Sequence, residues 1–402
     1  MIPPVFDEFG LIEKIANNKT NREVMNLNSI ESIIQKLNFY RGYFGKIHDL
    51  PLDEFEKLKQ NISTFFNLKP MASAAELPGF LVRISNNNRI LAGKGKELNY
   101  LTEIDELLAP PLKYCTFGRC NIPEQQVAYC ALDEASAYWE TKPQKGDVIT
   151  ISRFQLKPGA KAVCSVIRTE KTDNPKISHD LQKVFYLLEE FFIEIFSLPV
   201  DRLRPRDYLF SALISSDQLY YPVPSAGNIE AIIFPSVQRK KMGDNIAIKN
   251  DLLLKKYDLY SVETKFILDE YENLDPSIAE PTTDSIIGSF GTTAFDFKKG
   301  EILYNKEKAD ELFGLFRMMQ TGPNKQIRYD NGPDIPKSLS FNLAPVGWKP
   351  QPKPVVSAAI KSSNLSRNDK VNVEYANGVK FFGLKFKKVE QDINRGLCKI
   401  VD

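Results

Sequence analysis

The sequence is poor in the residues that build metal sites and disulfide frameworks. It has five cysteines and two histidines in 402 residues. An odd number of cysteines without C-x-x-C spacing predicts reduced, buried thiols. Cys115, Cys120 and Cys130 could supply three zinc ligands, but a tetrahedral site needs a fourth, and the only histidines are His48 and His179. We therefore expect no metal, and no Ser-His-Asp triad because neither histidine lies near a nucleophile motif.

The chain also has no strong charge of either sign and no long apolar run. Its formal net charge is +2, which gives no overall attraction to nucleic acid or membrane. The most apolar segment, residues 181–197, contains Glu189, Glu190 and Glu194 and is short for a bilayer span. The first ten residues contain acidic side chains and no basic region, which predicts no secretory signal. We expect a soluble, cytoplasmic protein without a membrane partner.

With 43% hydrophobic residues, the chain can build an ordinary core, and its length allows two or three domains. Residues 1–77 show the three-and-four apolar spacing of a helical N-terminal unit. Residues 345–370 are rich in proline and serine and predict a linker. In residues 371–402, alternating apolar side chains around Asn377-Gly378 predict a small β module of the SH3-like kind. Between these units we place a central region and a mixed α/β extension, at residues 78–250 and 251–344.

The C-terminal part is basic. From Lys337 onward there are 12 lysine and arginine residues against 5 aspartate and glutamate residues, a net charge of +7. The aromatic side chains lie where a hairpin core needs them, so a solvated face is favoured over a nucleic-acid patch. A nucleic-acid partner is therefore not expected.

The region around residue 120 carries most of the candidate chemistry. Residues 118–123, GRCNIP, predict an ordered turn because glycine and asparagine tolerate left-handed backbone angles, and this turn presents Arg119. Residues 127–132 are an apolar run typical of a buried strand. Asp133 can then cap a short helix in which Glu140 lies two turns along.

Other polar side chains are predicted at strands that could surround this region. Arg83 ends the strand pattern GFLVR, and Tyr129 lies within the buried run. Ser236 follows the strand IEAIIFP, and Asn245 follows a turn that leads into another strand. These side chains are candidates for binding a charged ligand.

In order and spacing, Arg83, Arg119, Tyr129, Glu140 and Ser236 resemble the RES domain, a family named after an arginine, a glutamate and a serine. The resemblance covers residues 78–250, including a closing G-x-N that ends at Asn245. It implies an α+β fold with an ADP-ribosyltransferase-like mixed β core and flanking helices. It also implies a bacterial toxin of a toxin–antitoxin system that degrades NAD without a metal, with an Xre-type antitoxin as a candidate partner.

The resemblance implies a role for each of these residues. It makes NAD the substrate, whose nicotinamide N-glycosidic bond is cleaved with water or phosphate as acceptor. The first alternative is ADP-ribosyl transfer to a protein or small molecule. The second alternative is a catalytically inactive RES-like interaction protein. The implied catalytic residues are Glu140, Arg83 and Ser236, and the implied NAD-binding residues are Arg83, Arg119, Tyr129, Ser236 and Asn245.

The chemistry of the side chains agrees with these roles, and each has a plainer alternative. Arg83 and Arg119 suit a pyrophosphate because a guanidinium binds phosphate oxygens in pairs, or they form surface ion pairs. Glu140 suits an oxocarbenium-like transition state, or it is an exposed helix residue. Tyr129 can stack on a base or pack in the core, and Ser236 can bind ribose or carboxamide or cap a turn.

Overall fold

A large mixed β-sheet forms the centre of the molecule. The computed structural model describes residues 30–66, 77–167, 179–221, 229–239, 242–267, 286–321, 339–345, 368–375, 380–394 and 398–401. The sheet consists of β1 (Phe80–Asn86), β2 (Val127–Ala131), β3 (Val148–Leu156), β4 (Val163–Val166), β5 (Ile229–Pro235), β6 (Asp244–Lys249), β7 (Tyr257–Ile267), β8 (Ile286–Thr292) and β11 (Leu339–Asn342).

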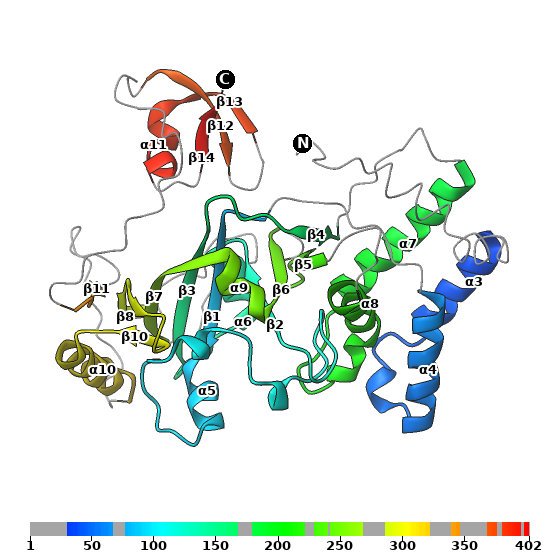
Figure 1. Ribbon diagram of the computed structural model, residues 1–402, viewed down its shortest axis with the longest axis horizontal. Coiled ribbons are helices and arrows are strands. Elements are labelled where there is room, and N and C mark those ends of the chain that lie inside the picture. The colour runs from blue at the N-terminus through cyan, green and yellow to red at the C-terminus, as the bar shows by residue number, and fades with distance from the viewer. Residues whose placement is uncertain are drawn as a thin grey trace.

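The strand order is β11-β8-β7-β3-β1-β2-β6-β5-β4, so the first strand in sequence lies in the middle (Figure 1). The pairs β4–β5 and β8–β11 are parallel, and the other neighbours are antiparallel. β3 pairs with β1 along seven residues and with β7 along nine, whereas β1 meets β2 at the Val82–Ala131 pair. The middle of the sheet therefore has one long and one short junction.

The two faces of the sheet are covered by different helices. α6 (Glu134–Thr141) packs on the face that presents Val82 and Ile84, with Tyr138 in the same apolar cluster. α5 (Asn87–Gly93), η2 (Ile104–Leu107) and α9 (Asn250–Lys256) contribute to the cluster around Leu81 on the opposite face. Successive side chains of a strand point to opposite faces, so Arg83 shares the face of Leu81 and not that of α6.

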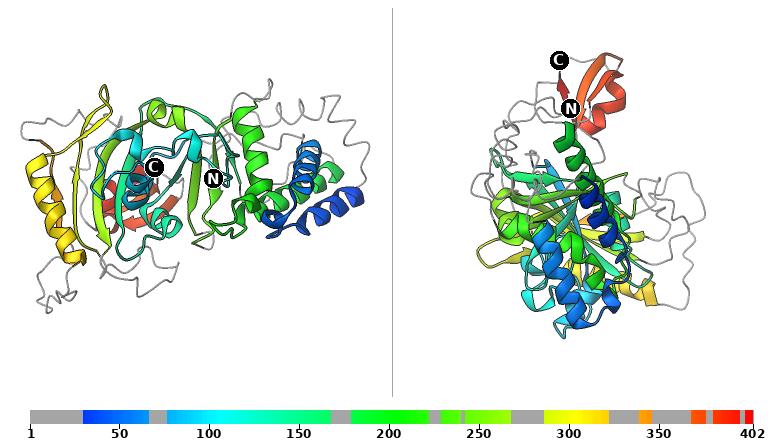
Figure 2. Two further views of the ribbon diagram at one scale, coloured as in Figure 1. Left: turned by 90° about the horizontal axis from the view of Figure 1, so that it is seen from below. Right: turned by 90° about the vertical axis from the view of Figure 1, so that its right-hand side faces the viewer.

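Four helices pack at one end of the sheet, on the same face as α6 (Figures 1 and 2). They are α3 (Ile30–Arg41), α4 (Leu52–Phe65), α7 (His179–Ser197) and α8 (Leu209–Tyr220). Tyr40 of α3 is buried against the rings of Phe191 and Phe210, with centroid distances of 6.4 and 5.4 Å. The predicted N-terminal helices and the apolar helix at 181–197 are confirmed, and all four helices share one core. The remainder of the predicted 1–77 unit, at 1–29 and 67–76, lies outside the described residues.

Beyond residue 250 the chain extends the same sheet. β7, β8 and β11 continue it from β3, and α10 (Lys306–Thr321) packs on the buried Phe266 and Phe290. Between β8 and α10 in sequence, β9 (Ala294–Asp296) and β10 (Glu301–Leu303) form a small antiparallel ribbon. The predicted boundary between 250 and 251 thus lies within α9, and the predicted extension shares the central sheet.

The C-terminal residues form a separate sheet with its own core. β12 (Lys370–Tyr375) pairs with β13 (Lys380–Lys385), as the predicted hairpin requires, and with β14 (Cys398–Val401). The helix α11 (Phe386–Asn394) follows β13 and buries Phe386 and Val389. The expectation of an SH3-like β module did not include this helix. Its signal is the spacing of Phe386, Val389 and Ile393, which are three and four residues apart.

Parts of the predicted linker and of the hairpin turn, residues 346–367 and 376–379, lie outside the described residues. None of the helices in the described ranges combines the length and apolarity needed to cross a bilayer.

Candidate functional site

The structure brings Glu140, Ser236 and Asn245 together on the α6 face of the sheet. Glu140 Oε1 accepts a hydrogen bond from Ser236 Oγ at 2.7 Å and one from Asn245 Nδ2 at 2.9 Å. Ser236 is fully buried and Asn245 is 5% exposed, while Glu140 is half-buried. Ser236 and Asn245 follow Glu140 by 96 and 105 positions, so local sequence patterns cannot predict these contacts.

Strand register places the two donors on the same face. Asn245 of β6 lies opposite Ala131 of β2 and Phe234 of β5. Ser236 comes two residues after Phe234 and therefore continues the same face of β5. Its N–H donates to the carbonyl of Gly243 at 2.7 Å, which closes the β5–β6 connection. Both donors consequently point to the side where α6 carries Glu140.

The first turn of α6 is held by the same connection. Asp133 caps the helix by accepting the N–H of Ser136 at 2.7 Å. Arg239, from the β5–β6 connection, donates to Asp133 Oδ1 at 3.1 Å and to Ser136 Oγ at 3.2 Å. A Cβ at Gly243 would collide with Ser136 Oγ, so this position requires glycine for close approach. The connection therefore binds α6 near its start and, through Ser236, near its end.

The carboxylate of Glu140 keeps one oxygen available. In the part of the chain that the structure describes, Oε2 has no hydrogen-bond partner, while Oε1 has two. A hydroxyl and an amide are neutral donors, so they orient the carboxylate without neutralising its charge. The arrangement can present a negative charge in a fixed position to a positive centre.

Arg83 lies apart from this cluster. Its side chain is on the opposite face of β1, where Nε and Nη2 donate to the carbonyls of Leu107 and Leu108 at 3.0 Å each. Nη1 donates to the carbonyl of Tyr129 at 2.8 Å, which links β1 to β2 next to their short junction. Burial lowers the pKa of Arg83. All three nitrogens thus bind main-chain oxygens in the described structure.

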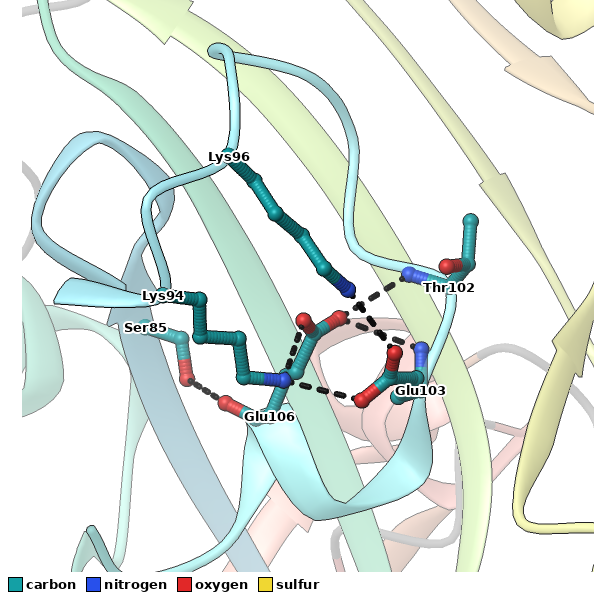
Figure 3. Close-up of polar contacts among 6 residues, drawn as sticks. All are labelled: Ser85, Lys94, Lys96, Thr102, Glu103 and Glu106. Carbon is teal, nitrogen blue, oxygen red and sulfur yellow. Dashed lines mark hydrogen bonds and ion pairs between the residues drawn. The ribbon is translucent and has the colours of Figure 1, made fainter. Parts of the chain in front are cut away.

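The segment that receives Arg83 is itself fixed by charges (Figure 3). Glu106 of η2 is almost fully buried and accepts Lys94 Nζ at 2.7 Å and the N–H groups of Thr102 and Glu103 at 3.2 and 3.1 Å. Lys94 also donates to Glu103 Oε2 at 2.8 Å, and Lys96 donates to Glu103 Oε1 at 2.9 Å. These bonds set the position of the carbonyls that Arg83 contacts.

Arg119 is bound to the end of a helix. Its Nη1 donates to the carbonyl of Phe196 at 2.6 Å and its Nη2 to that of Leu198 at 3.0 Å, where α7 ends. A cation at a helix C-terminus interacts favourably with the unpaired carbonyls there. The guanidinium also lies over the ring of Tyr208, 5.1 Å from its centroid.

Tyr129 supports the turn that carries Arg119. Its hydroxyl accepts the N–H of Cys120 at 2.7 Å and donates to Asn121 Oδ1 at 2.8 Å. Burial raises the pKa of Tyr129 well above its ordinary value. A Cβ at Gly118 would collide with Asn121 Oδ1 and approach the Tyr129 hydroxyl to 2.8 Å, so the turn depends on glycine.

The predicted residues therefore fall into two groups. Ser236 and Asn245 are hydrogen-bonded to Glu140, and no hydrogen bond or ion pair joins Arg83, Arg119 or Tyr129 to these three among the described residues. Sequence reasoning missed Arg202, whose Nη2 donates to the carbonyls of Glu140 and Thr141 at 3.3 and 2.8 Å. It lies in LPVDRLRPRDY, where prolines and an aspartate indicate a turn, but three arginines share that segment and none has a diagnostic spacing.

Comparison of the sequence with models of protein families gives no match, and comparison with curated proteins gives none either. Within the described ranges, no group of three or more histidine, cysteine, aspartate or glutamate side chains is placed to hold a metal ion.

Proposed function

We propose that this chain cleaves the bond between nicotinamide and ribose in NAD, with water or phosphate as the acceptor. The observation that carries the proposal is the carboxylate of Glu140, held through Oε1 by Ser236 and Asn245 while Oε2 is available. The mixed sheet with helices on both faces is compatible with the ADP-ribosyltransferase-like core that the resemblance implies.

The bond-breaking step needs a fixed negative charge from the protein. When the C1′–N bond breaks, nicotinamide leaves with the electron pair and positive charge develops at C1′ of the ribose. A carboxylate near C1′ stabilises that charge in the transition state. An oxygen of water or phosphate then bonds to C1′, and a water acceptor loses its proton to solvent. Glu140 would supply the charge, and Ser236 and Asn245 would keep it oriented.

The test is to incubate the full-length protein with NAD and to identify the products by chromatography and mass spectrometry. Release of nicotinamide with ADP-ribose indicates a glycohydrolase, and release with phosphorylated ADP-ribose in phosphate buffer indicates a phosphorylase. A protein or small molecule that gains the mass of ADP-ribose indicates a transferase. Intact NAD after long incubation with folded protein would refute the proposal.

One observation favours the alternative of an RES-like interaction protein without activity. The two arginines expected at the pyrophosphate, Arg83 and Arg119, both donate to main-chain carbonyls. If no other cation binds the phosphates, NAD would bind weakly. Calorimetric titration with NAD separates the two functions, because a chain without a phosphate site should show no measurable binding.

A further inference from the structure

The hydroxyl of Ser236 forms two hydrogen bonds, and one of them leads away from Glu140. Its Oγ donates to Glu140 Oε1 at 2.7 Å and accepts the main-chain N–H of Arg239 at 3.3 Å. A serine hydroxyl has a single proton, so the bond to Glu140 uses it and the bond from Arg239 fixes the oxygen from the other side. The position of the hydroxyl at Glu140 therefore depends on where the main chain of Arg239 lies.

The side chain of Arg239 attaches that main chain to α6. Nη1 donates to Asp133 Oδ1 at 3.1 Å and to Ser136 Oγ at 3.2 Å, where the helix begins. Asp133 and Glu140 are seven residues apart, which is about 10 Å along a helix. The β5–β6 connection thus holds the start of α6 through the side chain of Arg239 and the end of α6 through Ser236. These contacts close a ring of bonded groups.

The environment of Arg239 favours a role in geometry over a role in stability. Its side chain is 11% exposed, and Nε is buried without a hydrogen-bond partner in the part of the chain that the structure describes. A buried donor without a partner destabilises the folded state. The cap of α6 does not need the arginine, because Asp133 accepts the N–H of Ser136 directly. What the guanidinium adds is a fixed distance between the connection and the helix.

We propose that Arg239 is a positioning residue for the carboxylate of Glu140. Its side chain holds the β5–β6 connection against the start of α6, and its N–H holds the hydroxyl of Ser236 that orients Glu140. Arg239 forms no hydrogen bond or ion pair with Glu140 among the described residues, so the effect passes through Ser236. The consequence for turnover rests on the proposed function, whereas the link between Arg239 and Glu140 does not.

A double-mutant cycle of Arg239→Gln and Glu140→Ala, measured by urea unfolding of the full-length protein, tests this link. Independent residues change the equilibrium constant for unfolding by factors that multiply, whereas coupled residues depart from the product. We expect the double variant to depart from the product by about threefold or more. In a chain that also carries Ser236→Ala, the departure should disappear, because the link between the two residues is removed. Arg239→Gln with Glu54→Gln is the control pair, since Glu54 is exposed on α4, and its factors should multiply to within about twofold.

Asp133→Asn provides the same cycle with a milder change. Asparagine still caps the helix, but the substitution removes the negative charge that pairs with Arg239. Its cycle with Glu140→Ala should show a departure in the same direction, and it answers the question if Arg239→Gln does not fold.

Kinetics with NAD separate the positioning role from the proposed reaction. Arg239→Gln should lower kcat by about tenfold or more and leave KM within about twofold of the wild type. Arg239→Lys should recover part of the loss, because lysine keeps a cation beside Asp133. Coupling in the cycle while the wild type leaves NAD intact would refute the reaction alone. An unchanged kcat in Arg239→Gln would overturn the role in turnover. Effects that multiply in both cycles, or coupling that persists without the Ser236 hydroxyl, would overturn the positioning role itself.

Discussion

Glu140 is anchored through one oxygen by two neutral donors, Ser236 directly after β5 and Asn245 on β6. Such preorganisation matters for a reaction in which positive charge appears only in the transition state. The carboxylate can stabilise that charge without rearrangement of the protein. In the proposed reaction, the contribution of Glu140 belongs to turnover and much less to substrate binding.

Glu140→Gln should therefore reduce turnover of NAD by roughly 100-fold or more and change NAD affinity by only a few fold. The amide keeps the size of the side chain but removes its charge. Single-turnover kinetics and calorimetric titration measure the two quantities separately. Glu124→Gln is the control, since Glu124 is exposed and its side chain has no partner in the described structure. Glu134, on the same helix, is unsuitable because it binds Arg153 and Lys265. A variant that turns over NAD at the wild-type rate would exclude Glu140 from the chemistry.

Arg119 permits two opposite expectations. A pyrophosphate clamp would lose NAD affinity in Arg119→Lys, because lysine keeps the charge and loses the paired donors. The observed bonds to the carbonyls of Phe196 and Leu198 predict a different result: a loss of about 1–2 kcal/mol in the free energy of unfolding, with NAD affinity nearly unchanged. Urea unfolding and NAD titration of the same sample distinguish the two. Weaker NAD binding at wild-type stability would restore Arg119 to the substrate site.

Helix α6 is attached to the sheet by a charged network as well as by apolar packing. Arg153 of β3 binds Glu134 and Glu263 at 2.8 Å each, and Lys265 binds Glu134 at 3.1 Å. Ser289 completes the environment of Glu263 with a hydrogen bond of 2.7 Å. The network binds α6, the helix that carries Glu140, to strands β3 and β7. Protonation of its carboxylates should therefore weaken the attachment of α6 to the sheet.

This network predicts a dependence of stability on pH. Burial raises the pKa of Glu263, but Lys265 and Arg153 outweigh it, so the net pKa is lowered. A carboxylate with a lowered folded-state pKa stabilises the fold above its unfolded pKa of about 4.3, and this contribution is lost as the pH falls through the folded value. Glu263→Gln should cost about 2 kcal/mol at neutral pH and should flatten the acid side of the stability profile.

Urea unfolding at a series of pH values measures both effects. The control is Glu54→Gln, an exposed glutamate at the start of α4, which should change neither the stability nor its pH dependence by much. An acid profile in Glu263→Gln identical to that of the wild type would show that the network does not contribute.

Several elements were predictable from sequence because their signal is local. The apolar run at 127–132, the capping Asp133 and the apolar helix at 181–197 all have a period and an end that the chain itself encodes. Only the resemblance assigned Glu140 and Ser236 to one site, and local patterns do not predict their hydrogen bond. The face of Arg83 was not predicted, since alternation separates Leu81 from Val82 but does not say which face receives α6. Arg202 was not predicted either. Its bonds to the end of α6 depend on where the chain lies after α7, and local patterns do not encode that position.

The described residues form one large sheet with its helices, the small β9–β10 ribbon and a separate C-terminal sheet. The small core of Val371, Val373, Phe386, Val389 and Cys398 belongs to the C-terminal residues alone. By contrast, Leu343 is buried under α10 and β11 pairs with β8, so residues up to 345 belong to the large sheet. This places the end of the main unit directly before the proline-rich segment.

A chain truncated after Pro345 should therefore remain folded and should keep the activity and the melting temperature of the full chain to within a few degrees. Limited proteolysis of the full-length protein should cut between 346 and 367. Deletion of residues 30–66 is the contrasting variant: it uncovers Phe191 and Phe210, and it should yield insoluble protein. Insolubility of the chain truncated after Pro345 would show that the C-terminal residues complete the main core.

The position of β6 has a consequence for synthesis on the ribosome. On one side of β1 the strands β3, β7, β8 and β11 follow one another in the order of synthesis. On the other side, β6 lies between β2 and the earlier strands β5 and β4. In a nascent chain, β4 and β5 therefore cannot join the rest of the sheet until residues 244–249 have been made. The same strand, β6, carries Asn245. The setting of Glu140 is thus completed only when β6 has been made, so a nascent chain stopped before β6 has no assembled site.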